Sequence, residues 1–308
     1  MMIIEPGHMN LAHLRQIYDR HVPVQLTVAC HDQIHKSVET VADVMKSGKV
    51  VYGVNTGFGK LAQKIISEDK LSALQENLVL SHACGVGAPL DDHIVRLIMV
   101  MKINALAQGY SGVRLEVIEA LVTLLNHEIY PVIPEKGSVG ASGDLAPLAH
   151  LSAVLLGAGQ ARRNGKIISG QEALQHAGLE PLELGPKEGL ALLNGTQVST
   201  ALALSGLFMA ERAFMAAVVA GALTVDASKG SPAPFHHMLQ KVRGQKGQIK
   251  LARMYEELLE GSEIRDSHLE CDRVQDPYCL RCMPQVMGAC LDHIAFVELG
   301  ENKLDYSE

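Results

Sequence analysis

The stretch that most constrains this chain is GSVGASGDLAPLAH at residues 137–150, where a glycine-rich run changes abruptly to helix-forming residues. Gly137, Gly140 and Gly143 recur at every third position, so the backbone can take turns that a Cβ atom would block. Asp144 stands where a helix N-cap is expected, because a proline and a leucine-rich face follow it. The sequence therefore predicts a tight glycine loop that leads directly into a helix.

Three interpretations of this loop are open. It can be an ordinary tight turn before a helix. It can cradle a phosphate, although no Gly-Lys-Ser/Thr follows and the preceding HEIYPVIPEKG has prolines where a dinucleotide-binding loop needs a strand. The third concerns Ala141-Ser142-Gly143. If the amide nitrogen of Gly143 attacks the carbonyl carbon of Ala141 and two waters leave, a five-membered ring forms with an exocyclic methylene derived from Ser142. Ordinary side chains include no strong electrophile of this kind.

The composition favours a mainly helical globular protein. The chain has 308 residues, enough for one large domain or two modest ones, and a hydrophobic share of 47%. Aromatic residues make up only 4% and tryptophan is absent, which disfavours a β-sandwich. A formal charge of −7 indicates neither nucleic acid nor an anionic membrane as partner. The opening MMIIEPGHMN lacks the pattern of a secretory signal, so a cytoplasmic location is expected.

Local signals predict helices on both sides of the glycine loop. Asn10 caps a first helix, and Gly48 ends a second one over 32–46. Asn164-Gly165 predicts a type I′ hairpin, and Ser169 with Glu172 forms a capping box. Further helices are expected over 92–108 and 112–128, and another one begins near Ser67. Residues 49–52 are β-prone, and residues 236–270 are expected to be partly loop-like.

The region after residue 190 has a different character. A helix over 196–227 is nearly apolar all round, so it needs neighbours on every side. Polar residues interrupt the uncharged run at Asn194 and beyond, which favours a buried helix of a bundle over a membrane span. We therefore expect an N-terminal domain over 1–190, the start of a central helical bundle over 191–294, and a divergent tail over 295–308.

Four cysteines gather near the end of the chain, and Cys279-x-x-Cys282 has the spacing of half a zinc site. A structural zinc site normally has a second close pair, whereas Cys271 and Cys290 stand singly. Reduced, partly buried thiols are therefore expected here, with no metal.

Five segments along most of the chain have a motif-like character. They are YGVNTGFG (52–59), Ser81-His82, GSVGASGDLAPLAH (137–150), LNGTQ (193–197) and QDPYCLRCMPQ (275–285). Together they resemble the motifs of the histidine ammonia-lyases, within the aromatic amino acid ammonia-lyases. This family depends on a methylidene-imidazolone group, MIO (4-methylidene-imidazol-5-one). The resemblance implies a mainly α, MIO-type ammonia-lyase fold, a homotetramer, and a cytoplasmic lyase of histidine degradation that converts L-histidine to urocanate and ammonia without an external cofactor.

The resemblance also implies roles for individual residues. Ala141, Ser142 and Gly143 would form the MIO group, and Tyr52 would remove the β-proton of the amino acid. A phenol has a reference pKa of about 10, so this base needs positive charge or hydrogen-bond donors nearby. The β-proton is barely acidic, which is why the base alone would be too slow without an electrophile.

The remaining implied roles concern the substrate. Asn194 and Gln275 would contact MIO and substrate, Tyr278 would assist at the MIO group, and Arg281 would hold the substrate carboxylate as a fork. His82 would select histidine, because it can exchange hydrogen bonds with an imidazole and a phenyl ring cannot return them. Any one of these residues alone is more often structural, and their joint occurrence around the loop favours the functional interpretation.

The resemblance fades after about His293-Ile294, where members of the family continue for several more long helices. The chain is therefore expected to be a C-terminally truncated ammonia-lyase whose apolar helices lack partners, so that large apolar surface is exposed. The alternative is a catalytically incomplete remnant that assembles with a related full-length subunit. A phosphate-binding protein is the third possibility, and it requires nucleotide binding that Ser142→Ala leaves intact.

Overall fold

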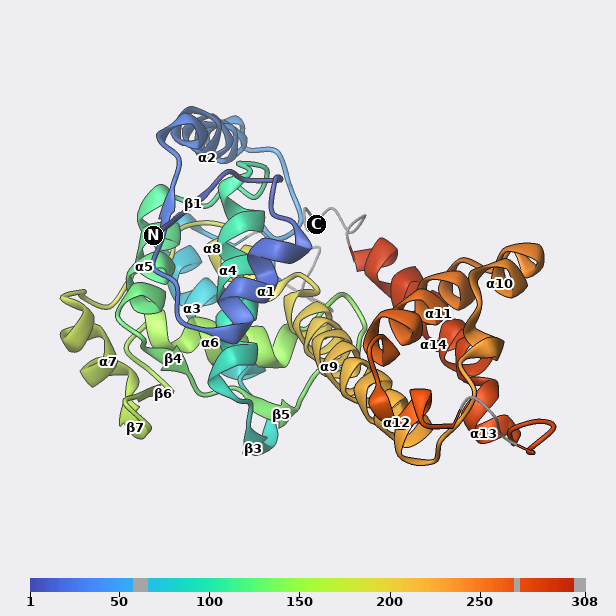
Figure 1. The fold of residues 1–308 in the computed structure, drawn as a ribbon. Coiled ribbons are helices and arrows are strands. Elements are labelled where there is room, and N and C mark those ends of the chain that lie inside the picture. Colours follow the sequence, from blue (N-terminus) through green and yellow to red (C-terminus); the bar gives the residue numbers. More distant parts are fainter. Residues whose placement is uncertain (58–65, 269–271, 302–308) are drawn as a thin grey trace. The chain divides into compact units, whose positions relative to one another are not determined.

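The computed structural model describes residues 1–57, 66–268 and 272–301. The chain divides into two compact units, Met1–Ser205 and Gly206–Lys303, and the division falls within helix α9 (Gln197–Ala227) (Figure 1). The boundary expected between residues 190 and 191 lies earlier, ahead of the same apolar helix.

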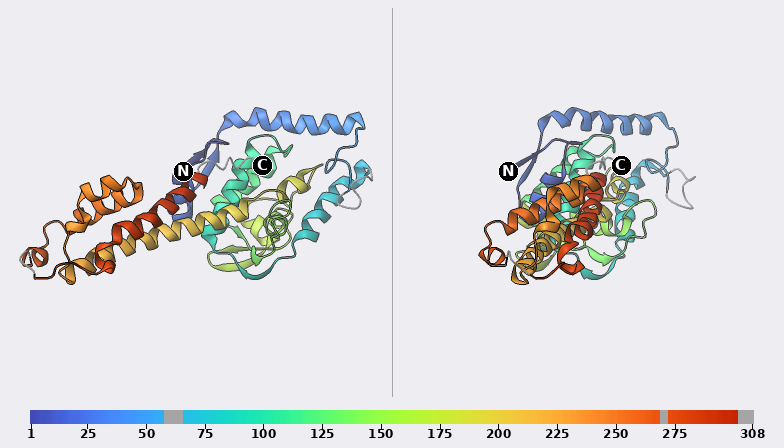
Figure 2. Two further views of the ribbon diagram at one scale, coloured as in Figure 1. Left: turned by 90° about the vertical axis from the view of Figure 1, so that its right-hand side faces the viewer. Right: turned by 45° about the vertical axis from the view of Figure 1, so that its right-hand side comes forward.

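The first unit is mainly helical, as the composition predicts. Figure 2 shows α2 running along the outside of this unit, where only Ile34 of the helix is buried. Its helices are α1 (Leu11–Asp19), α2 (His31–Ser47), α3 (Leu71–His82), α4 (Asp92–Ala107), α5 (Leu115–Asn126), α6 (Leu145–Leu155), α7 (Gly170–Ala177) and α8 (Glu188–Leu193), with 3-10 turns at Val28–Cys30 and Glu68–Lys70.

Short strands pair around these helices in three small sheets. β1 and β2 are parallel, β3 and β5 are antiparallel, and β6 lies between β4 and β7 in an antiparallel sheet. The strands are β1 (Met2–Ile4), β2 (Val24–Leu26), β3 (Val86–Pro89), β4 (Tyr130–Pro131), β5 (Pro134–Lys136), β6 (Gln160–Arg163) and β7 (Lys166–Ser169).

Helix α4 is the central element of the first unit. Its sequence DHIVRLIMVMKINALA is apolar on nearly every face, so it must be surrounded by other elements. The side chains from Leu97 to Asn104 are all buried, and α4 packs against both α1 and α5. Helix α6 is similarly apolar and is buried from Ala146 to Leu155 except at His150.

Most of the predicted local signals are confirmed. Asn10 and Ser169 each form a full capping box, with His13 and Glu172 as the reciprocal partners. Gly48 ends α2 in the left-handed conformation. Asn164 and Gly165 have φ angles of 50° and 74° between β6 and β7, and a type I′ turn needs positive φ at both positions.

Two local predictions are wrong for identifiable reasons. Residues 49–52 form no strand, because the side chain of Asn55 satisfies this backbone by donating to Lys49 O at 2.7 Å and accepting from Val51 N at 2.9 Å. The helix expected over 112–128 begins at Leu115, after Gly112 with a φ of 67°. The described part of the stretch over 236–270, expected to be partly loop-like, has short non-helical segments at 244–245 and 260–262 between its helices. These helices are α10 (His237–Arg243), α11 (Lys246–Leu259) and α12 (Glu263–Asp266).

The second unit is built around α11 and α14 (Met283–Glu301), which lie side by side. Gly247 and Gly288 allow this approach, because a Cβ atom on Gly247 would come within 2.1 Å of the Gly288 carbonyl oxygen. Phe235, in a 3-10 turn (Ala233–Phe235), stacks on Tyr255 with ring centroids 5.1 Å apart. The other core residues of this unit are Val218, Ala222, Val225, Leu251, Leu259 and Leu280, the last in α13 (Tyr278–Arg281).

Helix α9 exposes much of its apolar surface within this chain. Leu223 is 65% exposed and Met209 is 60% exposed, and Leu202, Met215 and Val219 are exposed as well. This confirms the expectation that apolar surface is exposed in this chain. Within the described residues, the stretch Glu188–Ala227 is long and apolar enough to cross a membrane, a property that core helices of soluble proteins share.

Two helical glycines provide a matched test of the packing of α8. A Cβ atom on Gly189 would lie 2.8 Å from the backbone oxygen of Gln75 in α3, whereas one on the exposed Gly206 of α9 meets nothing within 4 Å. We expect Gly189→Ala to lower the free energy of unfolding by about 1–3 kcal/mol through overpacking. Gly206→Ala should raise it by about 0.5–1 kcal/mol, because alanine loses less backbone entropy than glycine on folding.

Urea titrations of both variants followed by circular dichroism measure these changes. Equal effects at the two positions would contradict the close approach of α3 and α8.

Candidate active site

The glycine loop over 137–143 connects β5 to α6, and its backbone is sharply kinked at the centre. Ser142 has a φ of 58° and Gly143 a φ of 95°, both in the left-handed region. This region is uncommon for a residue with a side chain such as serine. Ala141 and Ser142 are exposed, whereas Gly143 is half-buried and Asp144 is buried. The structure thus turns the backbone at Ser142 and Gly143, two of the three residues that the ring chemistry involves.

The loop rests on the turn that follows α8. The Asp144 N–H donates to the carbonyl oxygen of Gly195 at 2.8 Å. A Cβ atom on Gly143 would lie only 2.6 Å from the same oxygen, so a larger residue at 143 would push the two segments apart. Asn194, half-buried, precedes this contact directly. The structure therefore brings together Gly143 and Asn194, two of the residues identified from the sequence.

Asp144 stands at the predicted N-cap position of α6, but its side chain does not cap that helix. Its Oδ1 instead accepts from the hydroxyl groups of Ser138 at 2.7 Å and Ser199 at 2.6 Å, and its Oδ2 accepts from the Ser199 N–H at 2.7 Å. Because Ser199 lies in the first turn of α9, the carboxylate also lies near the positive end of that helix. Asp144 thus ties the glycine loop to α9.

The segment that carries His82 is joined to the loop from the other side. Val86 of β3 pairs with Lys136 of β5, the residue before Gly137. The Gly85 N–H donates to Nε2 of His150 at 2.9 Å. The sequence gives no signal for this contact, although His150 is the last residue of the motif GSVGASGDLAPLAH. Ser81 and His82 end α3 a few residues before Gly85.

The tautomer of His82 follows from its partner. Its Nδ1 lies 2.8 Å from the backbone oxygen of Leu78 and 3.3 Å from the Ser81 hydroxyl. A carbonyl oxygen can only accept, so in the neutral ring Nδ1 carries the hydrogen and Nε2 is an acceptor. The imidazole therefore has its acceptor nitrogen at Nε2.

The other predicted site residues lie apart from this cluster in the sequence. Tyr52 is on a turn of the first unit and is 57% exposed. Residues 58 and 59 of the same motif fall outside the described residues. Gln275, Tyr278 and Arg281 belong to the second unit.

Within the second unit these residues form one local arrangement. The Arg281 guanidinium carbon lies 4.2 Å from the centroid of the Tyr278 ring, and the Arg281 Nε donates to Asp276 O at 3.0 Å. The buried Asp276 carboxylate accepts from the Ser231 N–H at 2.6 Å and from Arg273 at 3.1 Å. Cys279 and Cys282 are free thiols, while Cys271 falls outside the described residues.

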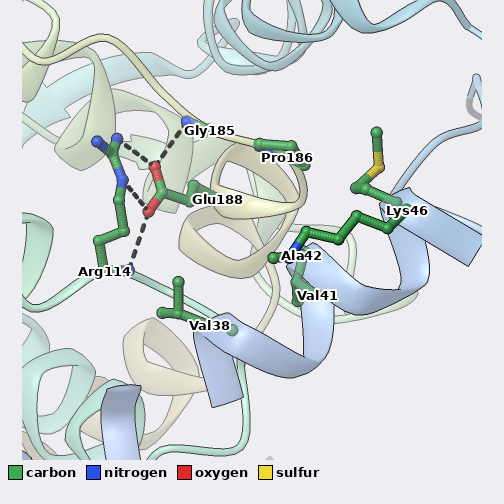
Figure 3. A pocket seen from close by; sticks show the side chains of 10 residues that line it. Val38, Val41, Ala42, Lys46, Arg114, Gly185, Pro186 and Glu188 are labelled. Carbon is green, nitrogen blue, oxygen red and sulfur yellow. Dashed lines mark hydrogen bonds and ion pairs between the residues drawn. The ribbon is translucent and has the colours of Figure 1, made fainter. Parts of the chain in front are cut away.

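A hollow beside α2 is separate from the glycine loop (Figure 3). Apolar side chains of α2 face the ion pair between Arg114 and Glu188 across it. The Glu188 carboxylate accepts from the Arg114 N–H and Nε at 2.9 Å each, and from Arg114 Nη2 and the Gly185 N–H at 2.7 Å each. These four bonds use the acceptor capacity of the carboxylate, so Glu188 fixes the start of α8.

Comparisons with known proteins agree with this geometry. Phenylalanine aminomutase of Pantoea agglomerans is 30% identical, with a TM-score of 0.91 over 100% of this chain and 63% of that one. Histidine ammonia-lyase of Trypanosoma cruzi is 31% identical, with a TM-score of 0.87 over 99% of this chain and 57% of that one. The fold is therefore that of the ammonia-lyases and aminomutases.

The sequence identifies the family. Residues 9–299 match the profile of the aromatic amino acid lyases. Histidine ammonia-lyase of Desulfotalea psychrophila is 60% identical over 291 residues, which are 94% of this chain and 57% of that protein. The chain belongs to the aromatic amino acid lyase family, and it spans a little over half the length of the curated relatives that it matches.

The contact between Gly85 and His150 predicts a loss of stability in acid. Burial lowers the pKa of His150 below its usual 6.5, and protonation of Nε2 would remove the acceptor for the Gly85 N–H. The unfolded chain therefore binds this proton more readily, so the folded state loses stability as the pH falls below about 6.5. We expect the stability advantage of the wild type over His150→Gln to shrink between about pH 7.5 and about pH 5.

Urea unfolding across this pH range measures the difference. His35→Gln, the same replacement on an exposed face of α2, is the control and should show no such trend. An advantage over His150→Gln that grows in acid would be opposite to the expected sign.

Proposed function

We propose that this chain is a histidine ammonia-lyase sequence that makes an MIO group from Ala141, Ser142 and Gly143 and eliminates ammonia from L-histidine to give urocanate. The observation that carries the proposal is the kinked backbone at Ser142 and Gly143, seated on the Gly195 carbonyl. The high identity to a histidine ammonia-lyase supports the choice of substrate. A cytoplasmic location and a homotetramer are part of the same proposal.

The residues of the loop fit the ring. Positive φ at Ser142 and Gly143 turns the chain back on itself, as attack of the Gly143 nitrogen on the Ala141 carbonyl requires. Gly143 has no side chain to hinder its nitrogen, and Ser142 carries the hydroxyl that must leave. Asp144 and Ser138 hold the flanks of the loop together. The completed group supplies an electrophile that draws electrons from the substrate.

The other residues of the first unit would act on the substrate itself. Tyr52, which is 57% exposed, would take the β-proton. The acceptor Nε2 of His82 would receive an N–H from the substrate imidazole, a bond that phenylalanine cannot make. Asn194 would offer its side-chain amide beside the loop.

The cluster of the second unit suits a carboxylate. Because Arg281 Nε is bound to Asp276 O, the two terminal nitrogens of the guanidinium carry the remaining N–H groups in a fork. The ring of Tyr278 lies under the guanidinium and holds its plane. Gln275 would add a polar contact to the substrate or the MIO group.

The mass of the purified chain tests ring formation directly. We expect a deficit of two waters, placed at residues 141–143 by peptide mapping, and a complete loss of this deficit in Ser142→Ala. Ser47→Ala at the exposed end of α2 is the matched control and should keep the deficit. An unmodified wild-type mass would overturn the MIO proposal for this chain, and urocanate production by Ser142→Ala would overturn the mechanism.

A second candidate function is favoured by the exposed apolar side chains of α9. In it, the chain is a catalytically incomplete partner that assembles with a related full-length subunit. The exposed surface of about five large side chains exceeds the isolated apolar residues of an ordinary monomer surface.

Light scattering after size exclusion separates the two functions. We expect the chain to form a discrete oligomer by itself, and Leu223→Glu on α9 to reduce its mass by placing a charge in the apolar contact. Val28→Glu, at an exposed valine of the first unit, should leave the mass unchanged. A wild-type monomer that forms an oligomer only when mixed with a full-length relative would favour the partner function.

A further inference from the structure

Lys102 is a buried charge-bearing side chain whose role the proposed chemistry does not explain. It lies in the middle of α4, within the run LIMVMKINALA whose other residues are apolar except Asn104, and is only 1% exposed. Burying an ammonium or an amine without partners is strongly unfavourable. A lysine at this position therefore needs acceptors within the core, and those acceptors indicate what it does.

Both acceptors of Lys102 lie at the end of α8. Its Nζ donates to Ala191 O at 2.7 Å and to Asn194 O at 2.6 Å. The last carbonyl groups of a helix have no partner within the helix, and lysine side chains can satisfy them. Lys102 thus closes the end of α8 from a neighbouring helix, far away in the sequence.

The start of α8 is fixed independently. The four hydrogen bonds of Glu188 hold the first residue of the helix, and Gly189 packs directly on the backbone of Gln75. Because the start of α8 is held in place, the position of the Asn194-Gly195 turn depends on how the carbonyl groups at the end of the helix are held. Those are the groups that Lys102 holds.

The turn after α8 carries the contact with the glycine loop. The Asn194 carbonyl belongs to the same planar peptide as the Gly195 nitrogen, so its position constrains Gly195. The Gly195 carbonyl in turn accepts from the Asp144 N–H and fills the space beside Gly143. A short path of hydrogen bonds and one peptide therefore leads from Lys102 to the kinked segment 141–143.

We propose that Lys102 is a positioning residue for ring formation: by holding the carbonyls of Ala191 and Asn194, it seats the Asn194-Gly195 turn against Gly143. This inference rests on the proposed function for its chemical purpose. Lys102 itself acts through the turn, because its nitrogen donates to the carbonyls of Ala191 and Asn194 and its side chain is buried.

A lysine suits this role in either protonation state. Burial lowers the pKa of Lys102 to about 7, so a large share of the side chain is neutral in neutral solution. The neutral amine retains two N–H groups, which match the two carbonyl acceptors. The short distances of 2.6 and 2.7 Å suit the ammonium form, which can make the same two bonds.

The test removes the hydrogen bonds while keeping the apolar stem. Lys102→Met has nearly the same length and no donor, and Ile103→Met is the control for a general disturbance of the same buried helix. We expect ring closure, followed as the loss of two waters at 141–143, to be at least about tenfold slower in Lys102→Met. Closure in Ile103→Met should match the wild type.

A second readout does not depend on the ring. In a Ser142→Ala background, hydrogen exchange at the Asp144 amide reports whether the turn stays seated, because this N–H donates to Gly195 O. We expect exchange at Asp144 to be at least about tenfold faster in Lys102→Met. Amides of α5, in the same core, should keep their protection, which a general loss of stability would not allow.

The outcomes separate the inference from the proposed function. A wild type without the mass deficit overturns MIO formation, and the Asp144 exchange then still decides the role of Lys102. A folded Lys102→Met with wild-type ring closure and wild-type exchange at Asp144 overturns the inference. If methionine prevents folding, Lys102→Gln replaces it and is read in the same way, since its side chain is one bond too short to reach both carbonyls.

Discussion

The close approach of two backbone segments, at Gly143 and Gly195, is the constraint on which the candidate site depends. The two segments are so near that a Cβ atom at 143 would overlap the Gly195 carbonyl. Such an approach gives the loop little freedom, since the Gly195 oxygen also receives the Asp144 N–H. The kink at Ser142 is therefore maintained by long-range packing and does not depend on the local preferences of a glycine-rich loop.

Three buried ionisable side chains lie in the elements that form or support this contact, and each makes at least one hydrogen bond to a backbone group. Asp144 accepts from the first turn of α9, Glu188 from the entrance of α8, and Lys102 donates to the exit of α8. Replacing such groups by apolar residues is often neutral or stabilising, so stability alone is a weak reason to keep them. Here each of them fixes the position of a peptide group around the loop, which an apolar side chain cannot do.

Local structure was largely predictable from the sequence, because its signals span only a few residues. The caps at Asn10 and Ser169 and the turn at Asn164-Gly165 each depend on side chains within reach of their own backbone. Asp144 has the local pattern of a cap, yet its carboxylate accepts a hydrogen bond from Ser199, which is 55 residues away in the sequence. Similarly, the β-prone segment at 49–52 forms no strand, because the side chain of Asn55 makes hydrogen bonds to its backbone.

The same limit applies to the site. The motifs located Ala141 to Gly143 and Asn194, but no spacing rule places a turn at 195 on a loop at 143. A lysine inside an apolar helix indicates that it has buried hydrogen-bond acceptors, but the sequence does not show which residues supply them. Nor does the sequence indicate that His150 accepts a hydrogen bond from the Gly85 N–H. The positions of Tyr52, Gln275, Tyr278 and Arg281 in the active assembly stay predictions.

The contact between residues 143 and 195 also bears on the order of events during synthesis. The loop emerges from the ribosome well before the segment that holds its kink, because Gly195 and Ser199 lie downstream of Asp144. A nascent chain that ends before them contains residues 141–143 but lacks the segment that packs against them. On the proposed chemistry, the ring would therefore close only after translation has passed Ser199 in α9 and the first unit has folded.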